Sequence, residues 1–183
     1  MNTATSVLSH MSESALLDHF ETLVARDRRT TTQLLVAIAE IDERKVWARH
    51  ACPSMFAFCV ERFHMSEQVT AKRIWAARTA RRFPSVLGMV ERGELNLAAI
   101  HVLARHLTPD NCRDVLERVS YVLGIYKALQ ILLPDERAAD AWVHQPNTAP
   151  LFAGRPALDR MLSGNVADLF VVRSYLDAQR GWQ

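Results

Sequence analysis

Glycine, proline and cysteine are scarce in this sequence, and the scarcity narrows the range of folds. Among 183 residues there are six glycines and seven prolines, and apolar residues recur at helical rather than alternating spacing. The three cysteines, Cys52, Cys59 and Cys112, are odd in number and form no CxxC pair, which is typical of a reduced protein. We therefore predict an all-α fold in a cytoplasmic protein.

A strong net charge and a membrane-length apolar run are also lacking. The formal charge is +2, from 22 Lys and Arg against 20 Asp and Glu, which is too weak to indicate nucleic-acid binding by itself. The longest apolar run, "VSYVLGIYKALQILL", is interrupted by Lys127 and falls short of the about 20 residues that span a bilayer. No signal-like segment opens the chain, and we predict no membrane partner.

Recognisable catalytic motifs are missing as well. The sequence contains no GxSxG, no GxxxxGK[ST] and no HExxH. The residues His50, Cys52, Cys59 and His64 have no standard zinc-finger spacing, and Cys59 lies on an apolar stripe, so a buried thiol is favoured over a metal ligand. We predict no enzyme, no cofactor and no metal. A catalytic site assembled from residues far apart in the sequence is the alternative.

The pattern of apolar and capping residues predicts a series of helices. A first helix begins at Ser12 and ends at "RDRRTTT"; a second one carries Leu34, Leu35, Ile38 and Ile41. Further helices are expected in "PSMFAFCVERF" with a stripe of Met55, Phe56, Cys59 and Phe63, from Ser66 to Phe83, from Pro84 to Gly93, in "LNLAAIHVLARHL", from Pro134 to Trp142, from Pro156 to Gly164 and from Asn165 onward. The stretch "HQPNTAPLFAGRP" is expected to be a loop.

A long helix is predicted to begin at "TPDN", with Thr108 as its cap and Pro109 at its first helical position. Its apolar residues step by four and three in a coiled-coil-like seam: Val115, Val119, Val122, Tyr126, Leu129 and Leu133. We favour a core contact within the chain, and a homodimer seam is the alternative. Gly124 within this helix indicates close packing.

The last helix is predicted to begin after its cap, Asn165, with Asp168 accepting from the free backbone amides. Leu169, Val172 and Leu176 are expected to face inward from it.

One helix is strongly basic. "AKRIWAARTARRF" contains no acid and carries Lys72, Arg73, Arg78, Arg81 and Arg82. Val69, Ala76, Ala80 and Phe83 line one stripe of it, with arginines opposite, so this helix is a candidate nucleic-acid surface. A solvated face, paired with acids such as Glu61, Glu67 or Glu91, is the favoured alternative.

Two parts of the chain resemble known families. Residues from about Leu34 to Leu116, with "SMFAFCVERFHMSEQVTAKRIWAARTARRFP" and "ERGELNLAAIHVLARHLTPDN", resemble the helical domain that precedes the nuclease module of bacterial HNH endonucleases. The nuclease motif itself has no counterpart. From Arg118 onward, Trp142, Pro146, Asn147, "LFAGRPALDRMLSG" and a closing helix ending in Arg-Gly resemble the toxin-binding domain of Xre/MbcA/ParS-type antitoxins.

The second resemblance implies an antitoxin that binds and blocks a RES-domain toxin, a class that consumes NAD or transfers ADP-ribose from it. It also implies a homodimer, and a C-terminal helix that lies against the toxin. The implied toxin contacts are Arg173, Tyr175, Leu176, Gln179, Arg180, Gly181 and Trp182. The loop residues Asn147, Phe152, Gly154 and Arg155 are expected to shape the domain.

The resulting organisation is a flexible segment 1–11, a helical domain 12–117 and a toxin-binding domain 118–183. Such antitoxins usually carry an N-terminal helix-turn-helix that binds promoter DNA, and none is evident here. The alternative function is a DNA-binding regulator acting through residues 72–82.

Trp182, next to the last residue, has two compatible interpretations. Gly181 is a left-handed helix stop that folds Trp182 back onto Leu176, or Arg180 and Trp182 project as interface anchors, which we favour.

Overall fold

The computed structural model describes residues 7–181, and these form two units, Met1–His106 and Leu107–Gln183. The boundary between the units falls at His106 and Leu107, whereas the two sequence resemblances meet near residues 117 and 118, inside a helix of the second unit. The predicted flexible segment 1–11 lies partly outside the described residues.

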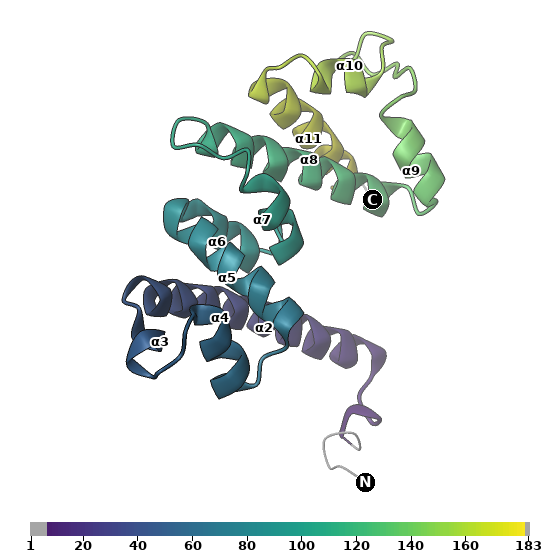
Figure 1. Cartoon of the computed structure of the whole chain (residues 1–183). Helices are drawn as coiled ribbons and strands as arrows, with labels where there is room; N and C mark the ends of the chain where they lie inside the picture. The colour runs from purple at the N-terminus through teal and green to yellow at the C-terminus, as the bar shows by residue number, and fades with distance from the viewer. Residues whose placement is uncertain (1–6, 182–183) are drawn as a thin grey trace. The chain divides into compact units, whose positions relative to one another are not determined.

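The fold is all-α, as predicted: no strand occurs in residues 7–181, although Pro146 and Pro156 form one isolated β-bridge. Unit 1 contains α2 (Glu13–Glu43), α3 (Val46–Arg49), α4 (Met55–Ala57), the π-helical η1 (Phe58–Arg62), α5 (Glu67–Arg82), α6 (Ser85–Glu91) and α7 (Leu97–Leu103). Unit 2 contains α8 (Cys112–Leu132), α9 (Glu136–Trp142), α10 (Ala157–Met161) and α11 (Val166–Arg180) (Figure 1). No helix within residues 7–181 combines the length and the apolar character needed to cross a bilayer.

Helix α2 corrects the prediction of two helices separated by "RDRRTTT", because it runs through that segment without a break. The segment contains no glycine or proline. The hydroxyl of Thr30 donates to the carbonyl of Arg26 and that of Thr32 to the carbonyl of Arg28, at 2.9 and 3.0 Å. These hydroxyls therefore bond back along the helix instead of competing with it. The predicted cap is confirmed, since Ser12 Oγ accepts from Ala15 N at 3.2 Å.

The core of unit 1 forms where α5 packs against the C-terminal half of α2 (Figure 1). Leu35 and Ile38 of α2 are buried, and α5 contributes small side chains that allow close approach, among them Ala76, Ala77 and Ala80. Val69 departs from the predicted inward stripe of α5, because 39% of it is exposed.

The predicted stripe of "PSMFAFCVERF" is also only half correct. Met55 and Cys59 are buried, whereas Phe56 and Phe63 are exposed and Phe58 takes their place in the core. The cause is η1, whose wider π-helical turn changes which positions face inward.

In unit 2, α8 and α11 lie side by side and carry most of the core, while α9 packs against α8 and α10 packs against α11 (Figure 1). Helix α8 begins at Cys112, after Thr108 and Pro109 rather than with them. Thr108 N donates to Asn111 Oδ1 at 2.7 Å, and Asn111 N donates to Thr108 Oγ1 at 3.2 Å. This reciprocal pair closes a separate turn, so "TPDN" precedes the helix that it was expected to begin.

The predicted seam on α8 does not form a core contact along its whole length. Leu129 is buried, but Val122 is 43% and Tyr126 is 52% exposed. The buried face is rotated toward Leu116, Gly124, Ile125, Ala128 and Leu129. The prediction of an internal core contact is therefore wrong for Val122 and Tyr126, because α11 packs against the neighbouring face.

Candidate functional site

Helix α11 carries the predicted toxin contacts, and its beginning is held by a network of side chains. Asn165 Oδ1 accepts from Ala167 N at 3.1 Å, which confirms Asn165 as the cap. Asp168 was predicted to accept from the free backbone amides. It accepts instead from Ser163 Oγ and Arg160 Nε, both at 2.7 Å. Arg160 also donates to the carbonyl of Leu151 at 3.0 Å. This network connects α10, the preceding loop and α11.

The hydrogen bond from Ser163 and the charge and hydrogen bond of Arg160 lower the pKa of Asp168 below its ordinary value. A carboxyl whose pKa is lower in the folded state stabilises the fold above its unfolded pKa and loses that contribution as pH falls through the folded pKa. We expect Asp168→Asn to lower the urea midpoint of unit 2 at neutral pH and to flatten its decline below pH ~4.

The matched control is Asp159→Asn, because Asp159 is exposed and forms no ion pair within the described residues. Urea titrations at neutral and acidic pH measure both variants. Equal pH dependence in wild type and Asp168→Asn would contradict the proposed coupling.

The loop before α10 is shaped by Asn147. Its Oδ1 accepts from Ala149 N at 2.9 Å, its backbone N donates to the carbonyl of Arg155, and its carbonyl accepts from Gly154 N. Gly154 has φ +78, which favours glycine. Phe152, at the centre of this loop, is 4% exposed. These contacts agree with the expectation that the loop residues shape the domain.

The inward face of α11 is the predicted one, since Leu169, Val172 and Leu176 are all buried. Leu176, one of the predicted toxin contacts, is only 2% exposed in the single chain, so its side chain offers little surface to a partner. Tyr175 is half-buried, with its ring stacked on Trp142 and edge-on to Phe152, at centroid distances of 6.4 and 5.2 Å. Both side chains stabilise unit 2, because they pack against its core from the inward side of α11.

Arg173 lies across α8 at Gly124. A Cβ at residue 124 would overlap the guanidinium of Arg173, so the predicted close packing at this glycine is confirmed. Arg173 Nε also donates to Asp177 Oδ2 at 2.6 Å. Arg173 therefore joins two helices, and only 28% of its side chain is exposed.

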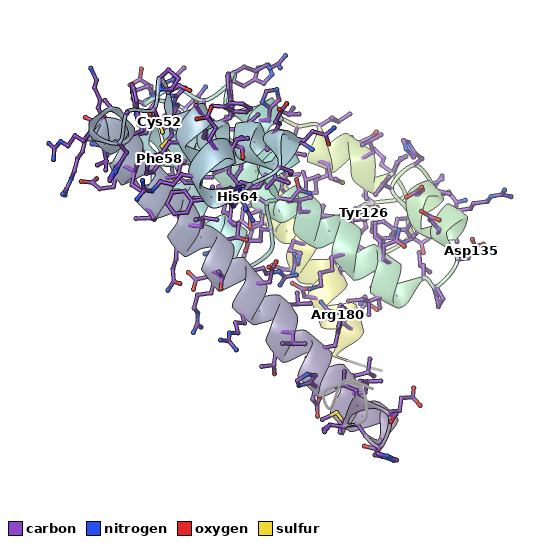
Figure 2. The ribbon with its side chains drawn as sticks, turned by 60° about the horizontal axis from the view of Figure 1, so that its bottom comes forward. Cys52, Phe58, His64, Tyr126, Asp135 and Arg180 are labelled. Atoms are coloured by element: carbon purple, nitrogen blue, oxygen red, sulfur yellow. The ribbon has the colours of Figure 1, made fainter. Side chains whose placement is uncertain are left out.

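The C-terminal end of α11 is open to solvent. Gln179, Arg180 and Gly181 are exposed, and the guanidinium of Arg180 approaches Asp177 at 3.4 Å (Figure 2 labels Arg180). Gly181 has φ −76 and ψ −7, so it is right-handed, and the prediction of a left-handed stop is wrong. Trp182 lies outside the described residues, and so does its predicted contact with Leu176.

Phe170 is a surface residue that sequence reasoning missed. It is 52% exposed, and its ring meets that of Tyr121 edge-on at 5.8 Å. The available signal was its position directly after Leu169, which places it away from the inward stripe of α11. Together with the exposed end of the helix, Phe170 makes the outward face of α11 a candidate partner-binding surface.

The basic helix α5 has ionic partners within its own unit. Arg78 Nε donates to Asp42 Oδ2 at 2.7 Å, and Arg81 lies 3.2 Å from Glu40 and 3.3 Å from Glu43. Hydrogen bonds from Arg44 and Arg81 lower the pKa of Glu40. The favoured interpretation of paired arginines thus applies to Arg78 and Arg81. The acids are on α2, however, and the expected Glu91 pairs with Arg29 instead.

The remaining cations of α5 divide between two environments. Lys72 and Arg82 are exposed on the same face as Trp75, which is 47% exposed. Arg82 also lies over the ring of Phe83, 5.2 Å from its centroid. Arg73 is half-buried, and its Nε has no hydrogen-bond partner in the described part of the chain.

The thiol of Cys59 is 2% exposed, and this burial raises its pKa. Cys52 and His64, which Figure 2 labels, were weighed together with Cys59 as zinc ligands in the sequence analysis. Within residues 7–181, no three or more His, Cys, Asp or Glu side chains gather closely enough to hold a metal.

Comparison with known proteins concerns unit 2. Residues 128–181 match the family described as the antitoxin Xre/MbcA/ParS C-terminal toxin-binding domain. An uncharacterized protein of Sinorhizobium fredii, y4oB, is 53% identical over 68 residues, which cover 37% of this chain and 51% of that protein. The chain thus spans about half the length of the curated relative that it matches. No solved structure matches. The resemblance of residues 34–116 to the HNH-associated domain gains no support from these comparisons.

Proposed function

We propose that this protein is an antitoxin that binds and blocks a toxin of the RES-domain class through unit 2. The observation that supports it most is the match of residues 128–181 to a toxin-binding domain, which covers α9, α10, α11 and the last turn of α8. In this proposal the protein acts by binding rather than by catalysis.

The proposed contact is the outward face and C-terminal end of α11. Phe170 offers an exposed aromatic ring. The C-terminal end of the helix, Gln179, Arg180 and Gly181, is exposed to solvent. Aromatic and arginine side chains are the usual anchors of protein interfaces. Trp182 remains a proposed anchor that follows them, while Tyr175, Leu176 and Arg173 position the helix from within.

The proposed antitoxin is also a homodimer through α8. Val122 and Tyr126 belong to a four-three apolar spacing and are 43% and 52% exposed in the single chain (Figure 2 labels Tyr126). Such spacing suits one helix lying along another.

Co-expression with a RES-domain toxin encoded beside this protein tests the function. We expect growth to be rescued and the two proteins to co-purify as a complex. Toxicity that persists, with both proteins soluble and no complex formed, would refute the proposal.

A second proposed function is binding of promoter DNA through α5. The observation that favours it is the shared exposed face of Lys72, Trp75 and Arg82. Phosphate contacts release counterions, with a slope of about 0.9 per contact in the dependence of log affinity on log salt.

Replacing Lys72 and Arg82 with alanine is expected to weaken promoter binding and to reduce that salt slope by about 2. The matched control is Arg81→Ala, which is expected to have a smaller effect because Glu40 and Glu43 already neutralise Arg81. Fluorescence anisotropy over a range of salt concentrations measures both. Absence of salt-dependent binding in the wild type would exclude this function.

A further inference from the structure

The N-terminal half of α2 carries an apolar stripe that nothing in unit 1 covers. Its residues are Leu16, Leu17, Phe20 and Leu23, which are 43%, 57%, 63% and 46% exposed. Residues three, four and seven apart lie on a single face of a helix, so Leu16, Phe20 and Leu23 share a face and Leu17 lies at its edge. The stripe is therefore one continuous apolar surface rather than scattered exposed residues.

The same face of α2 is buried farther along the helix. Leu35 follows Leu17, and Ile38 follows Phe20, by a whole number of helical turns at 3.6 residues each. Leu35 is 0% and Ile38 is 3% exposed, because α5 and α6 pack on this half. One face of the helix is thus covered over its second half and left uncovered over its first.

The uncovered half is also unsupported as a helix. Residues 13–30 include no buried side chain, and the purple half of α2 extends beyond the other helices of unit 1 in Figures 1 and 2. Helices of such length are marginal in water when no other surface packs against them. A partner surface would stabilise this segment and remove its stripe from water.

The order of charges along the segment indicates which partner fits. Glu13 lies three residues before the first leucine of the stripe, and Arg26 lies three residues after the last one. Asp18 faces away from the stripe, and Arg29 already pairs with Glu91 in unit 1. Two copies in antiparallel orientation bring Glu13 of each near Arg26 of the other, whereas two parallel copies place like charges together. Unlike charges within a Debye length of about 8 Å attract.

We propose that the N-terminal half of α2 pairs with the same segment of a second copy of this chain, in antiparallel orientation. Leu16, Leu17, Phe20 and Leu23 form the contact, related by a two-fold axis near the middle of the segment. This surface belongs to unit 1, differs from the contact proposed on α8, and does not depend on toxin binding.

Hydrogen exchange of the full chain, measured by mass spectrometry at several protein concentrations, tests the proposal. In the wild type, amides of residues 13–24 are expected to exchange at least about tenfold more slowly in concentrated than in dilute samples, because pairing suppresses local opening. In Phe20→Glu they exchange rapidly at every concentration. This readout reports on α2 itself and is independent of association through α8.

The matched control is Val36→Glu. Val36 is 50% exposed on the same helix, but its position faces away from the stripe. Residues 13–24 of Val36→Glu are therefore expected to show the same concentration-dependent protection as in the wild type. Exchange of α5 amides verifies that unit 1 remains folded in both variants. Exchange of residues 13–24 that is independent of concentration in the wild type, or an equal loss of protection in Val36→Glu, would overturn the proposal.

Charge reversal tests the antiparallel orientation. Replacing Glu13 with lysine, or Arg26 with glutamate, is expected to weaken concentration-dependent protection several-fold. Combining both substitutions in one chain is expected to restore it, because opposite charges face each other again. Protection that either substitution alone leaves unchanged would overturn the antiparallel arrangement.

Discussion

Replacement of Leu176 with alanine is expected to reduce the stability of unit 2 by about 3 kcal/mol, within the 2–5 kcal/mol that buried leucines cost. Leu176 is 2% exposed and belongs to the core that joins α8, α9, α10 and α11. A cavity at this position loses contacts to several helices, because a closely packed core relaxes only in part. Amides in the centre of α8 and α11 should exchange about a hundredfold faster.

The matched control for Leu176→Ala is Leu162→Ala. Leu162 is 74% exposed, so its truncation is expected to change stability by less than about 0.5 kcal/mol. Hydrogen exchange reports on the amides of unit 2 separately from those of unit 1. Equal effects of the two substitutions would mean that Leu176 is an accessible surface residue, as the sequence resemblance implied.

Removal of residues 180–183 is expected to leave unit 2 folded and to weaken binding of the proposed toxin by at least about 30-fold, the effect of losing one interface anchor. Arg180 and Gly181 are exposed, and the contact of Arg180 with Asp177 is a surface pair of little energetic value. Stability should therefore change by less than about 0.5 kcal/mol. Calorimetric titration with the toxin and exchange of α11 amides measure the two quantities.

Single substitutions refine the tail experiment. Arg180→Ala is expected to weaken toxin binding, whereas Arg137→Ala, at an exposed arginine of α9, is the control that should not. If the truncated protein binds normally, the end of α11 is not the contact. If unit 2 loses stability instead, the tail acts mainly as a local staple of α11.

Much of the helical framework could be predicted because the signals are local. Ser12 and Asn165 cap their helices, and Leu169 and Val172 face inward. Each depends on residues within one or two turns, which sequence spacing reports directly. The continuous helix through "RDRRTTT" was missed because threonine side chains can either break a helix or bond back along it.

The candidate site was predicted less well, because a motif identifies a segment and not the directions of its side chains. The sequence placed Tyr175 and Leu176 with Arg180 in one contact set. In the structure Leu176 is core and Tyr175 packs on Trp142, while Phe170 is left outside. Helical geometry separates neighbouring positions by about 100°, so the orientation of α11 decides which of them reach solvent.

The sequence by itself determined the all-α class, the caps Ser12 and Asn165 and the segment that matches a toxin-binding domain, since these follow from short-range spacing and motif order. Only the tertiary structure decided that Arg173 crosses Gly124, that Arg78 and Arg81 pair with acids on α2, and that Val122, Tyr126 and Phe20 stay uncovered. These outcomes depend on which helix faces approach each other across long sequence separations. An apolar residue on a helix is compatible with a core or a partner surface, and only packing distinguishes the two.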